Sequence, residues 1–102
     1  MIDLLGTLPK GYQDNAKVQF CGPSGADAVE AAIKLCKIAT GRETILVFSG
    51  AYHGMTQSTL AMMGNLEPKK EVRGLSPYIH FLPYPYAYRC AFGLKGEQSI
   101  KI

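Results

Sequence analysis

The sequence has few of the features that mark secreted, membrane or nucleic-acid-binding proteins. Its three cysteines, Cys21, Cys36 and Cys90, form no close pair, which predicts reduced thiols in a cytoplasmic protein rather than a disulfide framework or metal site. No apolar run approaches membrane-spanning length, and the first residues do not begin a signal peptide. The net charge is only +3, and the basic residues are scattered. We therefore expect no membrane partner and no nucleic-acid partner.

What is present is a chain of 102 residues that is 47% hydrophobic and 19% charged, which is typical of one small globular domain. Helix-like and strand-like patterns alternate along it and predict an α/β fold with three strands. The expected strands cover residues 18–21, 44–48 and 79–82, and the expected helices cover residues 2–8, 25–40 and 55–63. Residues 67–76 read as a surface loop, and prolines and glycines predict an irregular tail over residues 83–102.

The clearest helix is expected at residues 25–40, ending at Gly41. Its polar residues share one narrow stripe and are expected to be surface partners at helical spacing: Asp27, Glu30, Lys34 and Lys37. The remaining positions are nearly all apolar, so the helix should be buried on most of its circumference. The unbroken apolar run at residues 44–48 predicts a strand covered on both faces.

Residues 22–26, which read GPSGA, predict a phosphate cradle at the start of that helix. Unpaired amides and the positive end of the helix dipole favour an anion there. Small residues let the anion approach the amides of Gly25 and Ala26, and the Ser24 hydroxyl adds a third donor. The alternative is purely structural: Ser24 is a common N-cap, and Asp27 three residues later resembles a capping box, so Asp27 would point away or serve the cap.

A second signal follows the expected strand at residues 44–48. Tyr52 and His53 stand between Gly50 and Gly54, at the strand end where α/β sheets bind ligands. The structural alternative is a core aromatic beside a hydrogen-bonded histidine. A flat ring such as Tyr52 can cover a planar cofactor. A phosphate cradle and a ring cover together indicate a phosphorylated aromatic cofactor, which pyridoxal phosphate fits best.

These motifs resemble a known family. Residues 20–35 (FCGPSGADAVEAAIKL), 40–42 (TGR), 50–56 (GAYHGMT) and 64–65 (GN) closely resemble the class III pyridoxal-phosphate aminotransferases. The stretch at residues 81–93 (FLPYPYAYRCAFG) is similar to their 2,4-diaminobutyrate:2-oxoglutarate branch, in which proline is expected where Ala91 stands. The resemblance covers nearly the whole chain.

The resemblance implies roles for particular residues. Ser24, Gly25 and Ala26 would contact the cofactor phosphate, Tyr52 would stack on the pyridine ring, and His53 would line the same pocket. The parent enzyme would be a cytoplasmic homodimer that moves the terminal amino group of 2,4-diaminobutyrate to 2-oxoglutarate, giving aspartate semialdehyde and glutamate. Two alternatives stay open: another class III ω-amine aminotransferase, of 4-aminobutyrate or ornithine type, or a non-catalytic truncated product.

The family also needs a lysine that forms a Schiff base with the cofactor. None of the lysines in this sequence matches the surroundings of that lysine, so we expect no catalytic residue in the chain and no activity from it alone. The resemblance therefore implies an incomplete fragment of the fold-type I large, cofactor-binding domain, a single partial domain over residues 1–102. In such a fragment the helix at residues 25–40 would lose most of its covering.

Overall fold

The computed structural model describes residues 2–96, in which one long helix lies beside a small sheet. The α-helices are α1 (Ile2–Gly6), α2 (Lys10–Gln13), α3 (Gly25–Thr40) and α4 (Gln57–Met62). The strands are β1 (Ile45–Phe48) and β2 (Ile79–Leu82), and two short 3-10 helices are η1 (Glu67–Lys69) and η2 (Ala87–Arg89).

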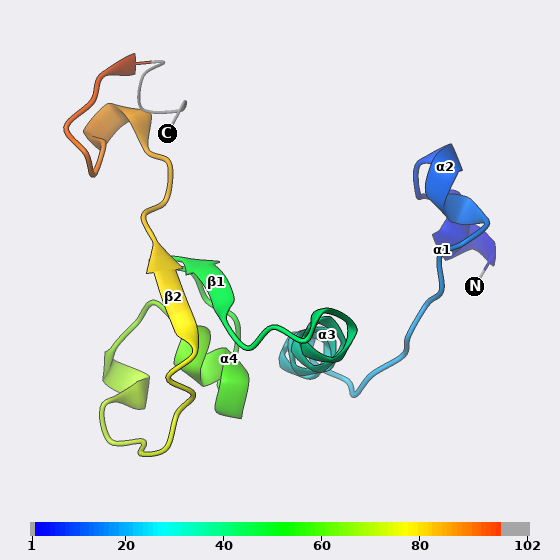
Figure 1. The fold of residues 1–102 in the computed structure, drawn as a ribbon, viewed down its shortest axis with the longest axis horizontal. Coiled ribbons are helices and arrows are strands. Elements are labelled where there is room, and N and C mark those ends of the chain that lie inside the picture. Colours follow the sequence, from blue (N-terminus) through cyan, green and yellow to red (C-terminus); the bar gives the residue numbers. More distant parts are fainter. Residues whose placement is uncertain (1, 97–102) are drawn as a thin grey trace.

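The two strands form a parallel pair in which Ile45 lies opposite Ile79 and Phe48 lies opposite Leu82. Parallel strands need a long crossover, and here the crossover contains α4 and η1. Figure 1 shows α4 beside the sheet, with α3 seen along its axis. This arrangement confirms the α/β class. The strand expected at residues 79–82 is present over its whole length, and the one expected at residues 44–48 is present over its last four residues.

The core lies between α3, α4 and one face of the sheet. Its buried residues are Ile33, Val47 and Met62, against which the partly buried Val29, Ile45 and Ile79 pack. Burying each large apolar side chain contributes about 1.5–3 kcal/mol. The other face of β1 carries Leu46, which is 62% exposed, and Phe48. The expectation of two covered faces is therefore wrong for the described residues, because helices pack on one face alone.

Two other expectations drawn from local patterns fail for the same reason. Residues 18–21 are not a strand: they lack a ladder partner among the described residues, and the Phe20 side chain is exposed. The helix α3 buries only Ile33 and leaves Leu35 and Ile38 exposed, so its apolar pattern alone overstated its burial, whereas the loss of covering expected for a fragment is confirmed. Periodicity specifies which face of an element is apolar, and burial needs a neighbouring element to pack on that face.

The chain as a whole is less compact than a domain of its length. The radius of gyration is 17.0 Å, against about 13 Å for a compact domain of this length. In Figure 1 the two N-terminal helices lie far from the sheet, joined to α3 by an extended segment.

The tail expected to be irregular over residues 83–102 contains one short 3-10 helix, η2, between residues 83 and 96 and is otherwise irregular there. Residues 97–102 lie outside the described residues. No helix between residues 2 and 96 has both the length and the apolar character needed to cross a bilayer.

Two glycines bring the end of α4 against the segment that follows β1. A Cβ atom added to Gly64 would lie 2.4 Å from the Gly50 Cα, so only glycine permits this approach. The Gly64 amide also donates a hydrogen bond to the Ala51 carbonyl oxygen at 2.9 Å. The start of the segment that carries Tyr52 and His53 is thereby fixed to α4.

Candidate functional site

The N-terminus of α3 is built by Ser24 and Asp27. Ser24 has an extended backbone, and its Oγ accepts a hydrogen bond from the Asp27 amide at 3.2 Å. The Ser24 hydroxyl in turn donates to the Asp27 carboxylate at 3.0 Å. Asp27 therefore serves the cap, which is one of the two roles expected for it; the other was to point away. As the first amides of a helix, those of Gly25 and Ala26 have no acceptor within α3.

The segment after β1 reaches this helix start through Gly54. Gly54 is buried and has a φ of +120°, which side chains rarely adopt. A Cβ atom placed on it would lie 2.6 Å from the Ala26 Cβ and 3.0 Å from Thr59 Oγ1. A side chain at this position would push the segment away from α3. Glycine is thus required for Tyr52 and His53 to come next to the helix start.

The two sequence signals meet at one pocket of about 440 Å³. This volume lies within the range of small-molecule sites, roughly 300–1,000 Å³. The pocket is lined by all five residues singled out from the sequence, Ser24, Gly25, Ala26, Tyr52 and His53, and also by Val29, Gly54 and Met55. Sequence reasoning missed Val29 and Met55, which carry no signal beyond being apolar.

The two aromatic residues of the pocket differ in exposure. Tyr52 is 71% exposed, so its side chain is accessible to a ligand. The His53 Nε2 atom, in contrast, is buried and has no hydrogen-bond partner among the described residues. A buried polar atom without a partner costs about 1–3 kcal/mol, and most such atoms in folded proteins are satisfied.

Glu30 is the residue whose place differs most from its expected one. Instead of lying in a surface stripe, its Oε1 accepts hydrogen bonds from Thr56 Oγ1 and the Ser58 amide, both at 2.7 Å, and from the Thr59 amide at 3.4 Å. Partial burial acts to raise the pKa of Glu30, but these hydrogen bonds outweigh it and hold the pKa below its ordinary value. No local sequence pattern marks this contact, because the donors follow Glu30 by 26 to 29 residues.

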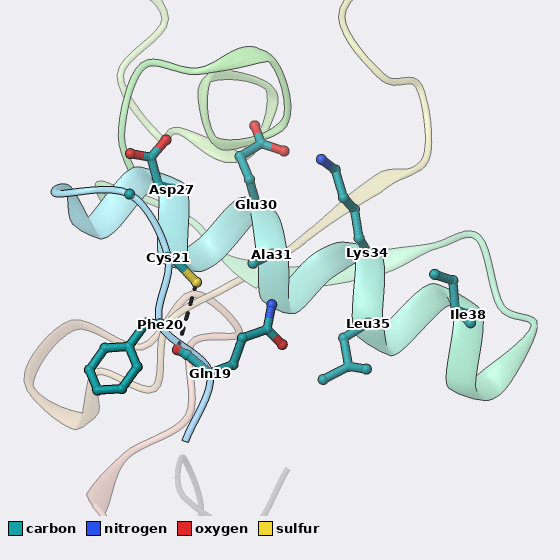
Figure 2. A pocket seen from close by; sticks show the side chains of 10 residues that line it. Gln19, Phe20, Cys21, Asp27, Glu30, Ala31, Lys34, Leu35 and Ile38 are labelled. Carbon is teal, nitrogen blue, oxygen red and sulfur yellow. Dashed lines mark hydrogen bonds between the residues drawn. The ribbon is translucent and has the colours of Figure 1, made fainter. Parts of the chain in front are cut away.

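A larger, more open groove of about 570 Å³ lies on α3, beside residues 19–22. Figure 2 shows Phe20 and Leu35 at this groove, with the Cys21 sulfur 3.9 Å from the Gln19 carbonyl oxygen. Its lining combines exposed apolar side chains such as Ile38 with the polar side chains of Asp27, Glu30 and Lys34. Within residues 2–96, no three or more His, Cys, Asp or Glu residues form a group able to hold a metal ion. The smaller pocket is the better candidate site because the two sequence signals meet there.

Comparisons with known proteins show which family the chain resembles. Residues 3–101 match the family described as aminotransferase class III. The chain is 61% identical over 97 residues to a diaminobutyrate–2-oxoglutarate aminotransferase of Rhizobium meliloti, covering 95% of this chain and 21% of that protein. It is 54% identical over 99 residues to the protein of that name from Haemophilus influenzae, covering 97% and 21%. The chain thus spans about a fifth of the length of these curated relatives.

A solved structure described as a transaminase with L-Ala superposes with a TM-score of 0.67. It covers 96% of this chain and 25% of the other chain, at 18% identity. At that identity the likeness concerns the fold alone. It shows that the arrangement of α3, α4 and the two strands also occurs in a larger transaminase.

Proposed function

Because the chain belongs to the class III aminotransferase family, we propose that it is the part of such an enzyme that holds pyridoxal phosphate. The whole enzyme would move the terminal amino group of 2,4-diaminobutyrate to 2-oxoglutarate, giving aspartate semialdehyde and glutamate. The names of the two relatives support this reaction. The observation that carries the proposal is the single pocket lined by Ser24, Gly25, Ala26, Tyr52 and His53.

The residues of the pocket fit the cofactor. The amides of Gly25 and Ala26 would bind its phosphate, helped by the positive end of the α3 dipole. Tyr52 would cover one face of the pyridine ring, and the unpartnered His53 Nε2 would gain a polar partner. The Ser24 hydroxyl now donates to Asp27, so it would have to rotate in order to donate to the phosphate.

The class III family depends on pyridoxal phosphate, which when bound supplies an aromatic ring that accepts electrons from the amino substrate. In this proposal the chain's own residues bind and orient that ring, and Tyr52 keeps water from one of its faces. The amino-acid and 2-oxo-acid substrates would be bound mostly by residues other than the 102 printed here.

The proposal also includes a homodimer in the cytoplasm. Cys21 and Cys36 lie exposed as free thiols, which agrees with a reducing compartment. Apolar side chains such as Leu35, Ile38 and Leu46 are exposed, and burying them against further protein would be favourable. Sedimentation of the purified enzyme tests the dimer.

The first test is to read the coding sequence on both sides of this chain. A continuation that carries a lysine able to bind the cofactor is expected, and the product of the whole coding sequence is called the complete protein below. Purified complete protein should form glutamate from 2-oxoglutarate with 2,4-diaminobutyrate, and more slowly with 4-aminobutyrate or ornithine. A preference for either of the latter donors would correct the substrate.

The 102-residue chain, assayed beside it, should form no glutamate because none of its lysines matches the expected surroundings. A coding sequence that stops at residue 102 would leave only a binding or structural role. Stoichiometric labelling of one lysine in the isolated chain by pyridoxal phosphate and borohydride, together with glutamate formation, would show a complete active site in these residues and refute the proposal of a partial domain.

A further inference from the structure

We propose that Glu30 is a positioning residue that ties the segment carrying Tyr52 and His53 to α3, and so sets the distance between the ring cover and the phosphate cradle. This inference rests on the proposed function, since it concerns the same pocket. Glu30 itself is absent from the residues that line the pocket. Its effect would be exerted through Thr56 and the start of α4.

Three donors converge on one oxygen of Glu30. Thr56 Oγ1 and the Ser58 amide each donate to Oε1 at 2.7 Å, and the Thr59 amide donates at 3.4 Å. The first amides of α4 have no acceptors in the helical ladder. A capping box between Thr56 and Thr59 serves part of this helix start, and the Glu30 carboxylate accepts from the Ser58 amide. The bonds to Glu30 join positions 26 to 29 residues apart in the sequence. They link two helices, whereas an ordinary capping box closes only one.

A second contact holds the same segment one helical turn away. Ala26 and Glu30 are four residues apart in α3 and therefore lie on one face of it. Ala26 packs closely against Gly54: a Cβ atom added to Gly54 would lie 2.6 Å from the Ala26 Cβ. A segment held at one point can pivot, but one held at two points about 6 Å apart along a helix cannot. Tyr52 and His53 immediately precede the first of these two points.

The chemistry of the contact favours an ionised carboxylate. A carboxylate is an acceptor only, and hydrogen bonds to an ionised group are shorter and stronger than those between neutral groups. The lowered pKa of Glu30, which these bonds cause against the opposing effect of burial, agrees with an ionised group. A glutamine would keep one acceptor oxygen and the same length, but it would be neutral and would bring two donors to a site that already has three.

The experiment uses the complete protein with Glu30→Gln and, as a matched control, Lys34→Ala, one turn further along α3. The readouts are the dissociation constant of pyridoxal phosphate, the near-ultraviolet circular dichroism of the bound cofactor, and the thermal unfolding of the cofactor-free protein. Glu30→Gln should weaken cofactor binding about tenfold, the size of one charge-assisted hydrogen bond. It should also change the dichroism band, while Lys34→Ala changes neither.

A double mutant separates positioning from general stability. If Glu30 acts through the Tyr52 segment, the penalty of Glu30→Gln for cofactor affinity should fall to about threefold or less in a Tyr52→Ala background, because coupled residues are not additive. Should Glu30→Gln unfold the cofactor-free protein, Thr56→Val replaces it, since it deletes one of the three donors and keeps the shape. Thr56→Val should weaken binding about threefold and shift the same band.

The outcomes separate the two proposals. Wild-type protein that binds pyridoxal phosphate, together with unchanged affinity and dichroism in Glu30→Gln or in its substitute Thr56→Val, would overturn the positioning role and leave the proposed function intact. Fully additive penalties in the double mutant would do the same. Wild-type protein that does not bind pyridoxal phosphate would overturn the proposed function, and the positioning role with it.

Discussion

The N-terminal arm, residues 2–22, and the packed unit, residues 24–82, both contain helices but hold them in different ways (Figure 1). In the arm the hydrogen bonds are local: Thr7 donates to the Leu4 carbonyl oxygen, and Gln13 donates to that of Leu8. No residue from 3 to 22 is buried. In the packed unit, Glu30 accepts hydrogen bonds from residues 26 or more positions away in the sequence, and these bonds accompany a buried core. Local bonds suffice to form a helical turn, and only the longer contacts fix where that turn lies.

The short helix α4 shows what those longer contacts contribute. It has six residues, too few to be stable on its own. Glu30 accepts from its first amides, and at its other end Lys69 Nζ donates to the carbonyl oxygens of Met63 at 2.6 Å and Ala61 at 3.3 Å. An anion at the N-terminus and a cation at the C-terminus both complement the helix dipole. The Lys69 ammonium also lies 4.9 Å from the centre of the Phe81 ring, which connects α4 to β2.

The largest contrast between the two regions is expected at their glycines. Gly54→Val would force a side chain into a φ of +120° and onto Ala26, and it should cost about 3 kcal/mol or more. Gly11→Ala in α2 meets open space at normal φ, and it should be neutral or stabilising by up to about 1 kcal/mol. Urea unfolding of the complete protein measures both. A loss of stability in Gly11→Ala as large as that in Gly54→Val would mean that the arm is packed in the complete protein, and it would remove the contrast between the two regions.

The packed unit is also where the sequence was the better guide to the fold. The helix at residues 25–40 begins and ends as predicted because Ser24 and Gly41 are strong local signals, with Gly41 at a φ of +66°. The expected helix at residues 55–63 is shorter, Gln57–Met62, since Thr56 caps it. The helix α2 and both 3-10 helices were missed. The failed strand at residues 18–21 had suitable residue types, but a strand exists only with a partner, and no local pattern supplies one.

For the site, local motifs found the residues that would touch a ligand but not the one that holds them in place. Tyr52 and His53 stand out because glycines flank them, and Ser24 stands out as a cap. Glu30 sits at regular helical spacing among other polar residues, which is the pattern of a solvated face. Its partners Thr56 and Ser58 follow it by 26 and 28 residues. A contact of that range depends on the packing of two helices, which single-sequence periodicity does not encode.

The next contrast compares two equally exposed tyrosines. Tyr52 is 71% exposed in the packed unit and Tyr12 is 68% exposed in the arm. Tyr52→Ala should weaken pyridoxal phosphate binding by about 0.5–1.5 kcal/mol beyond the lost contact area, the usual contribution of an aromatic pair. Tyr12→Ala should leave the affinity unchanged. Fluorescence titration of the complete protein measures both, and equal losses would show that exposure alone, not the pocket, explains the effect.

A smaller effect is expected at the hydroxyl groups. Ser24→Ala removes the cap of α3 together with a phosphate donor, and it should cost about 1 kcal/mol in cofactor binding or in stability. Thr7→Ala removes a hydroxyl that bonds only to Leu4 in the arm, and cofactor affinity should not change. Measuring both titration and thermal unfolding separates the two roles of Ser24. An unchanged value in both measurements would count against either role.

The smallest effect concerns pH, and it tests whether the long-range bonds to Glu30 stabilise the packed unit. The hydrogen bonds from Thr56 and α4 overcome the opposing effect of burial and lower the pKa of Glu30 from its ordinary 4.5 in the folded state. The unfolded state therefore binds the proton more tightly, so this stabilisation is fully present above about pH 4.5 and is lost as the pH falls through the lowered pKa. Glu30→Gln should flatten that part of the stability profile in urea unfolding between about pH 3 and 7, an interval that brackets this ordinary glutamate pKa. Lys34→Ala should keep the wild-type slope, and a wild-type slope in Glu30→Gln would show that other carboxylates account for it.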